Sequence, residues 1–252
     1  MHRSARLSAI LERLANGGTV DVAALAEELA ASPATIRRDL AALERQRLLA
    51  RTHGGAVAQG VSYELPLRYK GVRFAEEKRR IAVAAAATVS EGMAIGLTGG
   101  TTATEVARAL ADRQRLTIVT NALNIASELG ARPNLKLIVT GGLARSQSYE
   151  LSGPIAEASL VGLNLDVAFI GVDGIDAKAG CTTHEEVEAH TNSVMIQHSR
   201  RVVLVADSSK IGKVAFAQIC EAAAVDELIS NVGADDSAVQ ALADSGVRVT
   251  LV

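Results

Sequence analysis

Aromatic residues are scarce in this chain of 252 residues, which has three tyrosines, three phenylalanines and no tryptophan. Proteins that hold single-stranded nucleic acid do so largely by stacking the bases on aromatic side chains. The sequence has too few rings for such a platform. We therefore expect any nucleic acid that the chain binds to be double-stranded.

Cysteine is also scarce. Cys181 and Cys220 are the only two, and they lie far apart, without the spacing of a metal site and without paired histidines nearby. This pattern excludes a disulfide-stapled secreted domain and a zinc-binding module, and it predicts reduced thiols in the cytoplasm. We expect neither a bound metal nor a cofactor.

Long apolar runs are missing as well. No stretch reaches the roughly 20 apolar residues that span a bilayer, and the first residues do not resemble a signal peptide. We therefore expect a cytoplasmic protein without a membrane partner. The hydrophobic share of 48% is enough for an ordinary core, and the length leaves room for one small and one larger domain.

Residues 32–40, with the sequence SPATIRRDL, combine a helix start with a basic face. Ser32 can cap the first free backbone N–H groups, and Pro33 suits the first helical position. Ile36 and Leu40 recur at helical spacing, which predicts that they face a core. The residues left to face outward are Ala34, Thr35, Arg37 and Arg38.

Two more helices and a hairpin are predicted around this segment. Residues 6–14 carry leucine and isoleucine along one helical face, and residues 22–29 form a short helix that a tight turn separates from residues 32–40. Residues 48–57 predict two short strands around a Gly-Gly turn. The arrangement is that of a helix-turn-helix with a basic wing beside its recognition helix.

A winged helix-turn-helix predicts binding to duplex DNA, in which most arginine contacts reach phosphates and a few side chains read base edges. The basic excess lies in residues 1–56, with eight lysines and arginines against six acids, whereas residues 57–252 have eighteen against twenty-two. A solvated charged face would explain one basic run, but not the helix start, the spacing and the wing together. The candidate DNA-binding residues are Ser32, Ala34, Thr35, Arg37, Arg38, Arg51, His53 and Gly54.

The predicted domains are a winged helix-turn-helix over residues 1–57, a linker over residues 58–75 and an effector-sensing domain over residues 76–252. The charge run at residues 76–80 is expected to be the solvated first turn of a helix. Beyond it, apolar runs alternate with helical stretches, which predicts a mostly parallel α/β sheet covered on both faces. The predicted strands are Met93–Leu97, Leu116–Thr120, Leu135–Thr140, Val167–Gly171, Val202–Ala206, Glu227–Ser230 and Val247–Leu251.

The loops after these strands are polar and rich in glycine, and ligands of open α/β sheets gather at the carboxyl ends of strands. The loop from Thr98 to Thr102 leads into a helix and fits a phosphate, with Lys210 supplying charge and Asp173 binding sugar hydroxyls. Ordinary tight turns and a solvated lysine are the alternatives. The candidate effector-binding residues are Thr98, Gly99, Gly100, Thr101, Thr102, Thr120, Asn121, Gly141, Gly142, Asp173, Gly174, Thr182, Thr183, Glu185 and Lys210.

Eight segments together resemble the DeoR family of bacterial transcriptional regulators, also called GlpR-like, over essentially the full length. They are SPATIRRDL, LARTHGGA, TGGTT, TNALNIA, VTGG, GVDGID, GCTT and ADSSKIGKVAF, in the family order. The resemblance implies a C-terminal domain that shares its fold with ribose-5-phosphate isomerase, a phosphorylated sugar or polyol as effector, and a homo-oligomer, dimer or tetramer, on operator DNA. Many family members have Asp-Ser-Gly where this chain has Thr98-Gly99-Gly100, so this loop lacks their carboxylate.

Three functions are compatible with these features. The first is a sequence-specific repressor of a sugar or polyol operon that responds to a phosphorylated effector and has no catalytic residue. The second is a sugar-phosphate isomerase-like enzyme fused to a DNA-binding domain, with Asp173, Asp176 and Glu185 as acid and base. The third is a constitutive DNA-binding scaffold with a vestigial pocket.

Overall fold

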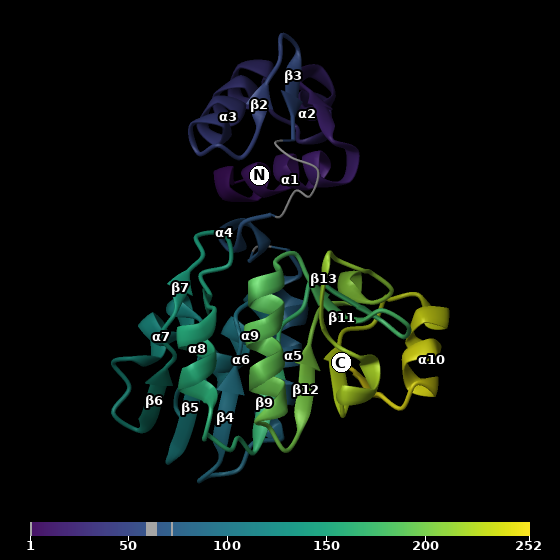
Figure 1. Cartoon of the computed structure of the whole chain (residues 1–252). Helices are drawn as coiled ribbons and strands as arrows, with labels where there is room; N and C mark the ends of the chain where they lie inside the picture. The colour runs from purple at the N-terminus through teal and green to yellow at the C-terminus, as the bar shows by residue number, and fades with distance from the viewer. Residues whose placement is uncertain (1, 59–64, 72) are drawn as a thin grey trace. The chain divides into compact units, whose positions relative to one another are not determined.

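The computed structural model describes residues 2–58, 65–71 and 73–252 (Figure 1). The chain divides into two compact units, residues 1–73 and residues 74–252. Within the described ranges, no helix is both long and apolar enough to cross a membrane. Residues 59–64 and 72 of the expected linker, which include Tyr63 and Val72, lie outside the described residues.

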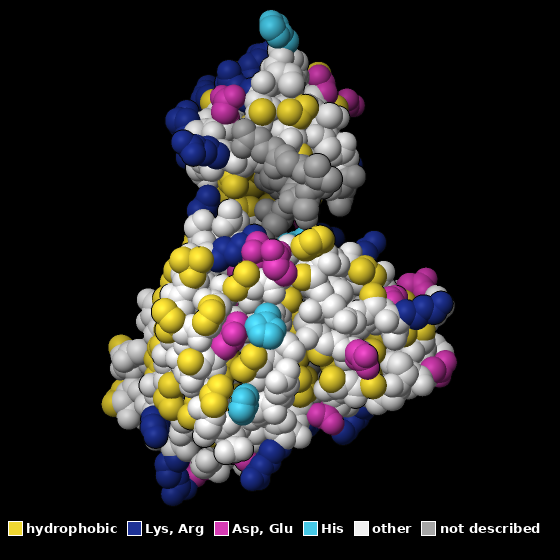
Figure 2. All heavy atoms as spheres, in the orientation of Figure 1, with side chains coloured by type: hydrophobic (Ala, Val, Ile, Leu, Met, Phe, Trp, Pro, Cys, Tyr) yellow, Lys and Arg dark blue, Asp and Glu magenta, His cyan; other side chains and the backbone are white. Residues whose placement is uncertain are grey.

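The first unit is a helical bundle with a small antiparallel sheet. Its elements are α1 (Arg3–Gly17), β1 (Thr19–Asp21), α2 (Val22–Glu28), α3 (Pro33–Arg45), β2 (Ala50–Arg51), β3 (Gly55–Val57) and α4 (Leu67–Lys70). Leucine and isoleucine side chains from α1, α2 and α3 fill its core, among them Ile10, Leu25, Ile36 and Leu40. Basic side chains gather over the part of the unit that α3 occupies (Figure 2).

Side-chain caps fix where the two central helices begin. The Asp21 carboxylate accepts hydrogen bonds from the Ala23 and Ala24 N–H groups at 2.8 and 3.0 Å, and so starts α2. The Ser32 hydroxyl accepts from the Thr35 N–H at 3.2 Å, and Pro33 follows at the first helical position of α3. The predicted capping of the recognition helix is confirmed.

The wing has a strand that the sequence did not predict. In the part of the chain that the structure describes, β1 joins β3, which pairs in turn with β2. Gly55 allows β1 to come this close, because a Cβ at Gly55 would lie 1.8 Å from the Val20 carbonyl oxygen. Within the expected linker, Leu67 and Tyr69 of α4 are buried, and Tyr69 belongs to the core of the first unit.

The second unit is built on a parallel sheet whose strand order is β15-β14-β12-β9-β4-β5-β6 within the described residues. All seven predicted strands are present, some with ends that differ by one residue. The five inner strands are buried on both faces, whereas the edge strands β6 and β15 keep exposed residues. Their bounds are β4 (Ala94–Leu97), β5 (Leu116–Thr120), β6 (Leu135–Val139), β9 (Val167–Ile170), β12 (Val202–Val205), β14 (Glu227–Ser230) and β15 (Arg248–Leu251).

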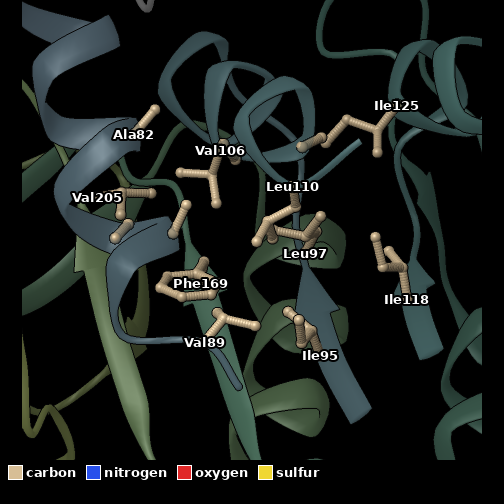
Figure 3. Packing of buried hydrophobic residues seen from close by; sticks show 14 of the residues in the cluster. Ala82, Val89, Ile95, Leu97, Val106, Leu110, Ile118, Ile125, Phe169 and Val205 are labelled. Atoms are coloured by element: carbon tan, nitrogen blue, oxygen red, sulfur yellow. The ribbon is translucent and has the colours of Figure 1, made fainter. Parts of the chain in front are cut away.

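Helices cover both faces of this sheet, and alternate strand residues point to opposite cores. Phe169, Ile95 and Leu97 face the first core, which the helices α5, α6 and α7 cover (Figure 3). Ala168 and Ile170 face the second core, which α8, α9 and α10 cover. The helices are α5 (Ala75–Ala87), α6 (Thr101–Leu110), α7 (Leu123–Leu129), α8 (Pro154–Leu160), α9 (Glu186–Gln197) and α10 (Asp236–Asp244).

Short strands lie in the connections that follow β6, β9 and β12. They are β7 (Leu143–Ala144), β8 (Leu151–Ser152), β10 (Gly174–Asp176), β11 (Gly180–Thr183) and β13 (Ala217–Cys220), with the 3-10 turns η1 (Ser208–Lys210) and η2 (Ala222–Ala224) nearby. β7 pairs with β8, and β11 lies between β10 and β13 in an antiparallel sheet. This small sheet carries several of the candidate effector residues.

Candidate functional site

The outer face of α3 has the predicted composition. Ile36 and Leu40 are buried at 0% and 1% exposure, whereas Ala34, Arg37 and Arg38 are exposed. The helix therefore turns two guanidinium groups to solvent from its first two turns, where a major groove would be read.

A basic groove of about 460 Å³ lies beside this face. Its lining residues are Arg3, Arg6, Thr35, Arg38, Asp39, Ala41 and Arg45. The Asp39 carboxylate, 3% exposed, accepts from Arg6 Nε at 2.5 Å and lies 3.6 Å from Arg3 Nε. Asp39 thus ties α1 to α3, and a buried pair of this kind destabilises strongly when one partner is removed.

The other candidate DNA-binding residues differ in whether their side chains already have a partner within the chain. The Ser32 and Thr35 hydroxyls lie 2.9 Å apart and hydrogen-bond one another. Arg51 on β2 is half exposed and pairs with Glu44, Nε to Oε2, at 3.2 Å. His53 and Gly54 are exposed in the turn between β2 and β3. A phosphate that reached Arg51 would compete with Glu44, whereas one at the wing turn would meet an open surface.

In the second unit, the chain order of the sheet reverses between β4 and β9. Such a switch point is where open α/β sheets bind ligands. The loops after the two strands touch, because the Thr98 hydroxyl accepts from the Gly171 N–H at 2.9 Å. A Cβ at Gly171 would lie 2.4 Å from the Gly99 carbonyl oxygen, so glycine is needed for this approach.

Glu150 brings a buried carboxyl group to this loop. A Cβ at Gly99 would lie 2.4 Å from its Oε1, so the glycine leaves the space that the carboxyl fills. Its Oε2 accepts from the side-chain amides of Asn121 and Asn192 at 3.1 and 3.2 Å. Burial, together with the charge of nearby Glu188, raises the pKa of Glu150 from 4.5 to about 8, although the two amides oppose that rise.

Two ion-paired groups lie near Glu150. Asp173, after β9, accepts from the Thr183 hydroxyl at 3.1 Å and from Lys210 Nζ at 3.4 Å. Arg145 lies 3.5 Å from a Glu185 oxygen and 3.4 Å from a Glu188 oxygen. Glu188 is buried and also accepts from the Ser148 hydroxyl. Among these described groups, four carboxyls, Glu150, Asp173, Glu185 and Glu188, lie with two cations, Lys210 and Arg145.

Two protein-family models match this chain. Residues 73–232 match the DeoR C terminal sensor domain, and residues 6–60 match the DeoR-like helix-turn-helix domain. The chain belongs to the DeoR family. It is a DNA-binding transcriptional regulator with a C-terminal sensor domain.

Relatives of this DeoR-family chain are named as regulators. The glycerol-3-phosphate regulon repressor of Escherichia coli K12 is 34% identical over 251 residues, 100% of each chain. The HTH-type transcriptional regulator GlpR of Haloferax volcanii is 36% identical over 241 residues, 95% of this chain and 94% of the relative.

Two solved structures are similar to this chain with low TM-scores. Ribose 5-phosphate isomerase A of Methanocaldococcus jannaschii has a TM-score of 0.38 and 18% identity, covering 54% of each chain. The sorbitol operon regulator SorC of Klebsiella pneumoniae has a TM-score of 0.41 and 12% identity, covering 96% of this chain and 99% of that one.

Several candidate effector residues of this DeoR-family chain hold its fold together. The Thr120 hydroxyl donates to the Leu97 carbonyl at 2.7 Å, and the Thr182 hydroxyl donates to the Gly174 carbonyl at 3.2 Å. A Cβ at Gly142 would lie 2.7 Å from the Ser152 carbonyl oxygen, and one at Gly141 would lie 2.5 Å from Ile155. Close packing therefore explains these glycines without a ligand.

Five further residues at the edge were not predicted from the sequence: Lys78, Arg145, Glu150, Glu188 and Asn192. Lys78 is the clearest correction. The charge run at residues 76–80 was expected to be a solvated turn, but Lys78 is only 3% exposed, and its Nζ lies 3.9 Å from Asp207 Oδ2. Helical spacing gave the signal, since Lys78 precedes Ile81, Ala82 and Ala85 on the buried side of α5. Glu150 lies in a polar stretch between two short strands and carries no such signal.

Proposed function

We propose that this chain is an operator-binding repressor whose second unit senses a phosphorylated sugar or polyol at the carboxyl edge of its sheet. DNA binding is assigned to residues 1–57 and effector sensing to residues 76–252, with residues 58–75 connecting them. The proposal rests on one observation, the meeting of the Thr98–Thr102 loop, the Asp173–Lys210 pair and Glu150 around one switch point.

The phosphate is assigned to the start of α6. Free N–H groups at a helix N-terminus favour an anion, and α6 begins at Thr101 directly after Gly100, whose φ of 112° suits glycine. Lys210 supplies positive charge from η1, and Lys78 from α5. A neutral Glu150 would not repel the ester and can donate a hydrogen bond to it.

The hydroxyl end is assigned to Asp173, Thr183 and Asn121. Within the described residues, Asn121 Oδ1 is buried without a hydrogen-bond partner, so a ligand hydroxyl would satisfy it. The Asp173 carboxylate accepts from Thr183 and Lys210, and a carboxylate offers about four lone-pair sites in all.

A sensor fits the carboxylates better than an isomerase does. Asp176 accepts from the Lys178 and Ala179 N–H groups at 2.8 and 2.9 Å, which closes the β10–β11 turn. These bonds lower the pKa of Asp176, which makes it a poor general base near neutral pH. Turnover of ribose 5-phosphate by purified protein, abolished by Asp173→Asn, would replace the sensor with the enzyme.

Lys210→Ala is expected to weaken effector binding by about 1.5–3 kcal/mol, the range for a hydrogen bond to a charged group. Operator affinity without effector should not change. Calorimetry with paired sugars and sugar phosphates measures this, and Lys178→Ala, an exposed lysine in the β10–β11 hairpin, is the control. Equal binding of both members of every pair would contradict the phosphate assignment.

A homo-oligomer, dimer or tetramer, is also proposed, because helix-turn-helix repressors commonly pair across two half-sites. Leu143 on β7 and Ile155 on α8 are 77% and 67% exposed, and hydrophobic side chains gather over these elements (Figure 2). The double variant Leu143→Ser/Ile155→Ser should have a lower mass by light scattering. Val83→Ser, at a site on α5 that is 66% exposed, should not. An unchanged mass in the double variant would exclude this face.

A further inference from the structure

The only two cysteines of the sequence, distant along the chain, face each other in the small antiparallel sheet. Cys181 on β11 and Cys220 on β13 are partners in the ladder, and the ladder changes register directly after Cys181. Both are free thiols. Opposed residues of antiparallel strands have Cα atoms about 4.5 or 5.5 Å apart, which lies within the range of disulfides.

The two side chains also point the same way. Cys181 belongs to the hydrophobic core on the α9 side of the sheet, and Cys220 packs against that core. The backbones lie close here, since a Cβ at Gly180 would be 2.2 Å from the Cys220 carbonyl oxygen. A bond between the sulfurs therefore needs rotation of side chains rather than movement of strands.

The two thiols differ in reactivity. Cys181 is fully buried, and Cys220 is only partly buried. The neighbouring Cys181 thiol lowers the pKa of Cys220, whereas the Cys220 thiol and burial raise the pKa of Cys181. The thiolate is the attacking species in disulfide exchange. Cys220 is thus the attacking residue, and Cys181 is the resolving residue.

We propose that Cys181 and Cys220 are a modification site that forms a reversible intramolecular disulfide with a low-molecular-weight disulfide as oxidant. The Cys220 thiolate attacks one sulfur of the oxidant, forming a mixed disulfide and releasing one thiol. Cys181, losing its proton, then attacks Cys220 sulfur and releases the second thiol. Two electrons pass from the cysteines to the oxidant, and both protons end on the released thiols.

The disulfide would act on the effector site, an extension that rests on the proposed function. Thr182 follows Cys181 directly and accepts through its hydroxyl from the Ala215 N–H at 2.9 Å. The next residue, Thr183, donates to Asp173. Fixing β11 to β13 at Cys181 therefore constrains the residues that orient Asp173. Effector affinity should differ between the two forms on the order of fivefold or more, a typical allosteric coupling.

The experiment incubates the folded full chain with glutathione disulfide and follows intact mass and free thiols. We expect loss of both thiols, a mass lower by two hydrogens, and return to the starting mass with dithiothreitol. Circular dichroism before and after oxidation verifies that the protein stays folded. A chain that stops at the mixed disulfide, or that links two chains, would overturn the proposal.

Two variants test the assigned roles. Cys181→Ser should accumulate the mixed disulfide at Cys220, and Cys220→Ser should leave Cys181 unreacted. Equal rates in the two variants would contradict the order of attack. Mass reports the disulfide whether or not an effector binds. Thus a disulfide without effector binding would count against the proposed function alone, and effector binding without a disulfide would count against this inference alone.

Discussion

Replacing both Arg37 and Arg38 by alanine is expected to weaken operator binding by about 2–6 kcal/mol, since an arginine that reads a guanine edge contributes about 1–3 kcal/mol. Both side chains are exposed on α3, whereas Ile36 and Leu40 of the same helix are buried. Because neither contributes to the core, the variant should keep the wild-type circular dichroism spectrum and melting temperature.

Fluorescence anisotropy with operator DNA, measured over a series of salt concentrations, separates two roles for these arginines. If they contact phosphates, the salt dependence becomes shallower by about one for each lost contact; if they read bases, preference at one or two positions relaxes. The double variant Arg115→Ala/Arg132→Ala is the control, because it also removes two positive charges, but from the second unit. An unchanged footprint in the Arg37/Arg38 variant would mean that α3 is not the recognition helix.

The sequence predicts those elements of the fold whose pattern is set locally. The inner strands of the main sheet are apolar runs because both of their faces are covered. Ser32 and Pro33 mark the start of α3. β1 has three residues, too few for an alternating pattern to appear. Gly174–Asp176 and Gly180–Thr183 have the composition of turns and become strands only by pairing with each other and with β13.

The candidate site shows the same division between local and tertiary signals. Loops that follow parallel strands could be located, because strand ends meet at one edge of a sheet whatever the details of packing. Glu150, Asn192 and Glu188 come from the segment before β8 and from α9, and only the tertiary fold brings them together. In the opposite direction, Gly141 and Gly142 have the composition of a ligand loop but are required by close contacts with Ile155 and Ser152.

Glu150→Gln is expected to make the second unit more stable than the wild type at alkaline pH. The pKa of Glu150 is about 8 in the folded chain against an ordinary 4.5, chiefly because the carboxyl is buried. A raised pKa means that the folded state binds the proton more tightly, so this stability is fully present below about pH 4.5. It is lost as pH rises through about 8. The whole difference is on the order of 5 kcal/mol.

Denaturant unfolding followed by circular dichroism between pH 5 and pH 9 measures this effect. The advantage of Glu150→Gln over the wild type should grow steadily and level off above about pH 8, because glutamine keeps the acceptor for Asn121 and Asn192 without a titrating proton. Asp176→Asn is the control, since its carboxyl has a lowered pKa and is ionised in both states over this range. Its stability difference from the wild type should therefore be constant.

The same titration should appear in effector binding if the phosphate lies at the Thr98–Thr102 loop. A phosphate beside Glu150 favours the protonated carboxyl, so wild-type affinity for a sugar phosphate should fall as pH rises through about 8. The affinity of Glu150→Gln should stay level, because the amide carries no charge at any of these pH values. Calorimetry of both proteins at pH 7 and pH 9 decides the point, with the unphosphorylated sugar as the matched ligand. Parallel pH profiles for the two proteins would place the phosphate away from Glu150.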